Sequence, residues 1–196
     1  MLENIIPNRV CFVGIDPGTT KIGVSAIYCR PDLSQILSVD SFTIHADKLN
    51  LSWWVEKTSG ARRARLDAAG YELLKFLYHS NPTAIATEAP FYNMKRPNAF
   101  AALMESVSTI ESVLHEYNFN LRLQKIDPPT VKRAIGAPGN ADKDLIKKTM
   151  KKHLFFGHQN FIDIETLDEH SLDSLAVCYC LFRTIYEGTQ RLPTYF

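Results

Sequence analysis

The feature that most constrains the fold is a set of three apolar, partly β-branched stretches joined by short turns near the start of the chain. The stretches cover residues 10–15, 21–28 and 36–44. Asp16-Pro17-Gly18 and Arg30-Pro31-Asp32 separate them, and both are combinations typical of tight turns. Strands linked this closely pair with their sequence neighbours, so the pattern predicts an antiparallel meander.

Beyond residue 60, helical and strand patterns alternate. The spacing predicts a helix over residues 61–79, whose apolar stripe holds Leu66, Ala69, Leu73, Leu74 and Leu77. Residues 48–60 are predicted to be a loop. Short strands are expected at residues 82–87 and 121–126, and helices at 97–117, 128–134, 142–154 and 168–187, the last ended by Gly188. This mixed alternation indicates an α/β domain.

Length and composition fit one globular domain. The chain has 196 residues, of which 45% are hydrophobic and 22% charged, so we expect one domain over residues 1–196, with 189–196 as a tail. No apolar run is long enough to span a bilayer, and Met1–Arg9 does not resemble a signal peptide. The cysteines lack the spacing of a zinc site, which predicts reduced, buried thiols in the cytosol. They are Cys11, Cys29, Cys178 and Cys180.

Charge is informative through its distribution, because the net charge is only +1. Cations gather at Lys95-Arg96, at Lys132-Arg133 and over residues 143–152, whereas acidic residues cluster over 163–173. A basic surface beside an acidic pocket is what a metal-dependent nuclease requires. A solvated lysine-rich helix is the competing interpretation of residues 143–152.

Four side chains could form one acidic site. Asp16 and Glu88 each end a predicted strand, and His170 and Asp173 share one face of the last predicted helix. Each has a plainer interpretation: a turn aspartate, a solvated strand end, or a surface histidine. Asp168 is expected to be the N-cap of that helix. Taken together, the four supply the oxygen and nitrogen ligands that Mg²⁺ or Mn²⁺ accepts.

Four motifs, in order, resemble those of the RuvC family of Holliday-junction resolvases. Residues 13–23 are similar to the family's opening G-I-D-P-G strand end and the T-x-x-x-G that follows. Thr87–Phe91 resembles its second motif, a strand-end Glu with an aromatic residue three positions on. Lys132 and Asp142-Lys143 resemble its basic segment, and residues 170–176 resemble its closing D-x-x-D-A-L-A helix. The set spans nearly the whole chain.

The resemblance implies an RNase H-like fold, a five-stranded mixed sheet flanked by helices. It also implies a catalytic set of Asp16, Glu88, His170, Asp173 and Lys132. The first four would hold two Mg²⁺ or Mn²⁺ ions, and Lys132 would act near the scissile phosphate. The DNA-binding residues that it implies are Phe91, Lys132 and Lys143. The distribution of charge adds Lys95, Arg96 and Lys147 as expected DNA-binding residues.

The implied activity is metal-assisted phosphodiester hydrolysis that cuts four-way DNA junctions by paired symmetric nicks. A homodimer is implied, acting in the cytoplasm or wherever DNA recombines, with no membrane partner and no small-molecule cofactor. The apolar face of residues 97–117 could form the dimer contact or could be intramolecular core. Phe91 matches an aromatic residue that stacks at the branch point of the junction, although it could instead plug the core beneath its loop.

The chain departs from the family pattern in two places. His170 stands where Asp is commoner, which puts metal preference and pH optimum in question because imidazole also ligates transition metals. Residues 49–65 match none of the family's motifs and could alter the choice of substrate.

Three alternatives remain open at this point. Ile15–Thr20 also resembles the first phosphate motif of the actin/Hsp70/sugar-kinase group, although that group needs two such halves and a second phosphate motif. The chain could be a non-catalytic binder of branched DNA that retains the fold. It could also be an RNase H-like nuclease for flaps, forks or RNA–DNA hybrids.

Overall fold

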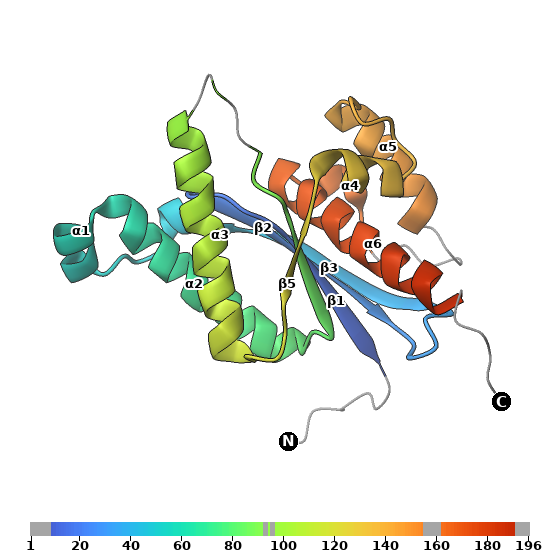
Figure 1. The fold of residues 1–196 in the computed structure, drawn as a ribbon, viewed down its shortest axis with the longest axis horizontal. Coiled ribbons are helices and arrows are strands. Elements are labelled where there is room, and N and C mark those ends of the chain that lie inside the picture. Colours follow the sequence, from blue (N-terminus) through green and yellow to red (C-terminus); the bar gives the residue numbers. More distant parts are fainter. Residues whose placement is uncertain (1–8, 92–93, 95–96, 155–161, 191–196) are drawn as a thin grey trace.

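A five-stranded mixed sheet lies between two helical layers (Figure 1). The computed structural model describes residues 9–91, 94, 97–154 and 162–190. The strand order is β3-β2-β1-β4-β5. Strands β1 to β3 form an antiparallel meander, whereas β4 runs parallel to β1 and β5 parallel to β4. The strands are β1 (Val10–Asp16), β2 (Lys21–Cys29), β3 (Ile36–His45), β4 (Ala84–Glu88) and β5 (Leu123–Ile126).

Helices cover both faces of the sheet. Helices α2 and α3 pack on one face, and α6 lies on the other with α4 and α5 beside it. The helices are α1 (Trp53–Ser59), α2 (Ala61–Ser80), α3 (Pro97–Tyr117), α4 (Pro128–Ala134), α5 (Lys143–Leu154) and α6 (Glu169–Gln190), with 3₁₀ turns at Ala46–Lys48 and Ile164–Thr166. The predicted five-stranded α/β fold and its antiparallel meander are therefore confirmed.

Strand β1 organises the core because it is buried on both faces. Val13 and Ile15 point to the layer of α2 and α3, whereas Phe12 packs against α6. This alternation is the period-2 geometry of a strand. The central strand therefore joins two separate hydrophobic clusters, and its end is held rigidly between two helical layers.

Two predictions about element boundaries are wrong. Residues 48–60 are not a loop, since they contain α1, whose N-cap Ser52 accepts a hydrogen bond from the backbone N–H of Val55. Gly188 does not end α6, which continues to Gln190. A glycine in a last helical turn costs only about 1 kcal/mol relative to alanine. Residues 189–190 are therefore helical rather than part of a tail, and residues 191–196 lie outside the described part of the chain.

All four cysteines are buried and free, as the sequence predicted. Burial raises the pKa of Cys11 and of Cys29 to about 12, and raises that of Cys178 well above the ordinary value. Within the described residues, no helix is both long and apolar enough to cross a membrane.

Candidate active site

Two carboxylates stand side by side at one edge of the sheet. Asp16 ends β1 and Glu88 ends the parallel neighbour β4, with Ile15 opposite Thr87 in register. The Thr87 hydroxyl donates a 3.0 Å hydrogen bond to the carbonyl oxygen of Ile15. This bond ties the two strands together immediately before the carboxylates, so the backbone fixes where Asp16 and Glu88 emerge.

Helix α6 reaches the same edge because two glycines let its backbone lie directly on the β1–β2 hairpin. A Cβ atom at Gly14 would stand 2.3 Å from the backbone nitrogen of Cys178, and one at Gly23 would stand 1.9 Å from the carbonyl oxygen of His170. Both distances are far shorter than any contact that a real Cβ makes. Glycine at these two positions therefore sets the height of α6 above the sheet.

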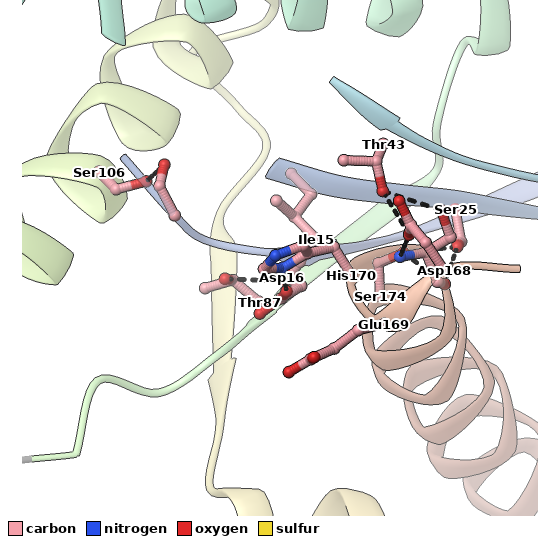
Figure 2. Close-up of polar contacts among 12 residues, drawn as sticks. Ile15, Asp16, Ser25, Thr43, Thr87, Ser106, Asp168, Glu169, His170 and Ser174 are labelled. Carbon is pink, nitrogen blue, oxygen red and sulfur yellow. Dashed lines mark hydrogen bonds and ion pairs between the residues drawn. The ribbon is translucent and has the colours of Figure 1, made fainter. Parts of the chain in front are cut away.

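His170, in the first turn of α6, bonds Asp16 directly. The His170 Nδ1 and Asp16 Oδ2 atoms are 2.7 Å apart (Figure 2). The Asp16 side chain is 14% exposed and that of His170 is 32% exposed, so solvent still reaches the pair. The hydrogen bond with Asp16 raises the pKa of His170, although partial burial opposes the rise. The imidazole therefore gains protonated character beside the Asp16 carboxylate.

Glu88 and Asp173 complete an acidic cluster. Burial, followed by the negative charges of Asp16 and Asp173, raises the pKa of Glu88 to about 7. Burial and the charge of Asp16 likewise raise the pKa of Asp173 to about 6. These mutual influences require the carboxylates to lie close together. Burial and the neighbouring negative charges therefore disfavour the ionised forms of Glu88 and Asp173.

Two lysines of the α6 layer act electrostatically on the carboxylates. Lys132 on α4 opposes the rise in the pKa of both Glu88 and Asp173, and its Nζ donates a 3.0 Å hydrogen bond to the carbonyl oxygen of Ala141. Lys143 at the start of α5 acts on Asp173 in the same way while it forms an ion pair with Glu169. The basic segment thus borders the acidic cluster.

A chain of hydroxyl groups anchors the start of α6 to the sheet. The Ser25 Oγ in the buried strand β2 lies 2.7 Å from the Oγ atoms of both Ser41 and Ser174. Ser41 also donates a 2.9 Å bond to the carbonyl oxygen of Ser171. Because these contacts join three elements, they fix the rotation of α6 about its own axis.

The N-cap of α6 belongs to the same chain. Asp168 accepts bonds from the Ser171 backbone N–H, at 2.9 Å, and from the Thr43 hydroxyl, at 2.7 Å (Figure 2). Burial alone would raise the pKa of Asp168, but these hydrogen bonds lower it. The predicted N-cap is confirmed. Sequence reasoning missed the other hydroxyl groups, whose one signal is a polar serine inside the apolar stretch of β2.

The sequence-predicted residues divide into three groups in the structure. Asp16, Glu88, His170, Asp173 and Lys132 come together at the sheet edge, as their motifs predicted. Phe91 and Lys143 lie in the flanking segments, and the Phe91 side chain is 74% exposed, so the interpretation as a core plug is wrong.

Lys147 is half-buried on α5, and its charge helps to lower the pKa of Glu165 rather than that of the clustered carboxylates. Lys95 and Arg96 lie outside the described residues. Lys147 is therefore the member of the predicted DNA-binding set that the structure places away from the acidic cluster.

Metal-binding potential rests on donor chemistry. Within residues 9–91, 94, 97–154 and 162–190, no group of three or more His, Cys, Asp or Glu side chains is arranged so that it could hold a metal ion as it stands. The acidic cluster nevertheless fits a divalent cation chemically, because burial and then neighbouring negative charge raise the pKa values of Glu88 and Asp173, and a cation would favour their ionised forms.

A separate, largely apolar cavity lies at the other end of α6. It has a volume of about 400 Å³ and is lined by residues of the β2–β3 turn and of the last turns of α6, among them Leu33, Tyr179, Phe182 and Tyr186. His170 and Asp173 stand at the opposite end of α6. The acidic cluster is therefore separate from this cavity.

Comparison with known proteins places the chain in context. No family model matches it. Over 168 residues it is 28% identical to the crossover junction endodeoxyribonuclease RuvC of Finegoldia magna, which covers 86% of this chain and 90% of that protein. The structure of Thermus thermophilus RuvC superimposes with a TM-score of 0.65 at 17% identity, covering 92% of this chain and 98% of that one. The resemblance to RuvC is confirmed.

A second structure, T. thermophilus RuvC in complex with Holliday junction substrate, gives a TM-score of 0.63 at 16% identity, covering 92% of this chain and 97% of that one. The RuvC-like fold thus extends over nearly all of the chain. The segment that the family motifs leave out, residues 49–65, corresponds to α1 and the first turn of α2.

Proposed function

We propose that this chain is a structure-selective endonuclease that cuts four-way DNA junctions by paired symmetric nicks. The observation that carries the proposal is the convergence of Asp16, Glu88, His170 and Asp173 at one edge of a RuvC-like sheet. Sequence similarity to a crossover junction endodeoxyribonuclease over 86% of the chain supports it. Flaps, forks and other branched DNA are the alternative substrates.

The residues divide the work of phosphodiester hydrolysis. Asp16, Glu88, Asp173 and His170 would hold two Mg²⁺ or Mn²⁺ ions, which would supply activation of a water and stabilisation of negative charge on the leaving oxygen. His170 positions the Asp16 carboxylate through their 2.7 Å hydrogen bond. Lys132, held by the carbonyl oxygen of Ala141, places a positive charge beside the carboxylates, where it can balance a bound phosphate.

Phosphate binding would come from the basic segment that follows. Lys143 and Lys147 on α5, with Lys95 and Arg96 after β4, are the proposed backbone contacts, and the exposed Phe91 ring is the proposed stacking group. On α3, the Met104 side chain is 40% exposed although Val107 and Ile110 are core. The exposed part of that helix supports the proposed homodimer. Each chain would form one domain, and the dimer would act in the cytoplasm or wherever DNA recombines.

Cleavage of defined DNA substrates tests the proposal. A labelled four-way junction and a duplex of matched sequence are incubated with the protein in Mg²⁺, Mn²⁺ or EDTA. We expect paired nicks on the junction alone, which EDTA removes. Asp32→Asn is the matched control for Asp16→Asn, because Asp32 is an exposed aspartate in the β2–β3 turn.

Other outcomes would redirect the proposal. If the protein cuts flaps or forks instead of junctions, its assignment as a nuclease stands and its assigned substrate changes. Binding without cutting in either metal would support a non-catalytic binder of branched DNA, and ATP hydrolysis without DNA would favour the phosphate-loop enzymes.

A further inference from the structure

Helix α1 carries two tryptophans that the fold does not use. Trp53 is 69% exposed and Trp54 is 60% exposed. The two rings meet edge to face, with centroids 5.7 Å apart and planes at 80°, which leaves much of each ring open to solvent. Trp ordinarily dominates the packing of a core or an interface. Two adjacent exposed copies therefore need an explanation outside the core.

The local sequence builds this helix without tertiary burial. None of the residues of α1 is buried, and the helix packs chiefly on the start of α2. Ser52 caps its first turn, and Gly60, at φ 87°, ends it in a conformation that favours glycine. A helix of seven residues is marginal in isolation. The Ser52 cap and Gly60 therefore fix the ends of a short helix that carries both tryptophan side chains on its exposed surface. We call the exposed rings of Trp53 and Trp54 the platform.

Basic residues are frequent in the sequence on both sides of the two tryptophans. Five basic residues lie between position 48 and the second turn of α2, in the segment that contains α1: Lys48, Lys57, Arg62, Arg63 and Arg65. Arg62 pairs with Glu105, and Arg63 pairs with Asp67. In the described part of the chain, neither Lys48 nor Lys57 has an acidic partner, so their charges are available to an anion.

Hydrogen bonds place the platform on the catalytic side of the molecule. The Arg65 Nε donates a 3.3 Å bond to the carbonyl oxygen of Thr19, and the Ser106 hydroxyl donates a 3.0 Å bond to that of Gly18. Both acceptors lie in the turn directly after Asp16. Figure 1 shows α1 standing out from the body of the domain beyond the start of α2. A polymer bound at the Asp16 edge can therefore continue onto α1.

We propose that Trp53 and Trp54 form a stacking platform for bases exposed at the branch of the DNA, with Lys48 and Lys57 holding the adjacent phosphates. Aromatic rings beside cations suit nucleic acid with accessible bases, because every base has a face that can stack and every linkage carries a charge. A second copy of the chain fits less well, since self-association would bring two basic surfaces together. The proposal rests on the proposed function for the identity of the DNA.

Intrinsic fluorescence tests the platform directly, because Trp53 and Trp54 are the two tryptophans of the whole chain. The full-length protein is titrated with a four-way junction in EDTA, so that no cutting occurs, and binding is followed separately by the anisotropy of a label on the DNA. We expect tryptophan emission to be quenched in step with binding. Binding with unchanged emission would overturn the proposal, as would a complete failure to bind.

Variants test whether stacking contributes to affinity. Trp53→Ala/Trp54→Ala should weaken junction binding about tenfold or more, since one stacked base is worth at least about that factor. Phe119→Ala is the matched control: it removes a 64% exposed aromatic ring from the α3–β5 turn, at the opposite edge of the sheet. Circular dichroism should show both variants folded. Equal affinity of the double variant and the wild type would overturn the proposal.

The outcomes separate this proposal from the nuclease assignment. If the double variant binds the junction with normal affinity and still cuts it, the proposed platform is rejected and the proposed nuclease activity stands. If the junction quenches the tryptophan emission of the wild type but the wild type cuts no junction, the proposed platform stands and the proposed nuclease activity is rejected. Emission that changes with protein concentration in the absence of DNA, and not on addition of DNA, would show that the face binds protein instead.

Discussion

Gly23→Ala should damage the candidate site through the backbone alone. A Cβ atom at this position would lie 1.9 Å from the carbonyl oxygen of His170, whereas real Cβ contacts are essentially never shorter than 3.0 Å. The hairpin and α6 must therefore separate by about 1.1 Å or more. A shift of that size is enough to break the 2.7 Å bond between His170 and Asp16.

Two consequences follow from that displacement. We expect the free energy of unfolding to fall by about 1–3 kcal/mol, the usual cost of forcing an extra carbon into a packed interface. We expect cleavage per folded molecule to fall about a hundredfold, since misplacement of about 1 Å is sufficient for a loss of that size. Urea denaturation measures the first, and the rate of junction cutting at saturating metal measures the second.

Gly188→Ala provides the matched control on the same helix. Nothing lies within 4 Å of a Cβ atom at Gly188, so that variant should keep full activity and should gain up to about 1 kcal/mol of stability. Wild-type stability and cutting by Gly23→Ala would refute the reasoning, because they would mean that α6 does not rest on the hairpin as closely as described.

Four further predictions concern the charged groups and the exposed ring. Asp16→Asn should abolish cutting while junction binding survives, as measured by parallel cleavage and anisotropy assays. His170→Asp should keep activity but change the ratio of Mn²⁺-supported to Mg²⁺-supported rates; an unchanged ratio would mean that His170 is not a ligand. Phe91→Ala should reduce cutting more than it lowers the melting temperature, because the ring is 74% exposed. The metal-free protein should lose stability as the pH rises from about 4 to about 7, because the folded chain binds protons at Glu88 and Asp173 more tightly than the unfolded chain does. Mg²⁺ should reduce that loss of stability. A melting temperature that does not depend on pH would contradict the burial and crowding of the two carboxylates.

The sequence predicted what depends on local pattern. Alternating apolar residues and Asp16-Pro17-Gly18 were enough to place the hairpin, and the ends of parallel strands meet at one edge, so Asp16 and Glu88 could be expected to meet. Helix α1 was missed because it has no buried stripe from which periodicity can be recognised. Its cap, Ser52, is the one local signal that favoured a helix.

Long-range polar contacts were beyond sequence reasoning for a different reason. Ser25 and Ser174 are 149 positions apart, and nothing in either neighbourhood indicates that their hydroxyl groups meet. The bond between His170 and Asp16 spans 154 positions. The motifs predicted that both residues belong to one site, but only the packing of α6 on the sheet establishes that they touch.

The buried cysteines give the two helical layers separate chemical reporters. Cys178 belongs to α6 and faces the sheet, where its Sγ atom donates a 3.1 Å bond to the carbonyl oxygen of Phe12, and Cys11 belongs to the cluster beneath α2 and α3. A thiol reagent can reach either sulfur only when the corresponding layer lifts from the sheet. The relative alkylation rates of Cys178 and Cys11 therefore measure which face of the sheet opens first, and whether DNA closes the face that carries α6.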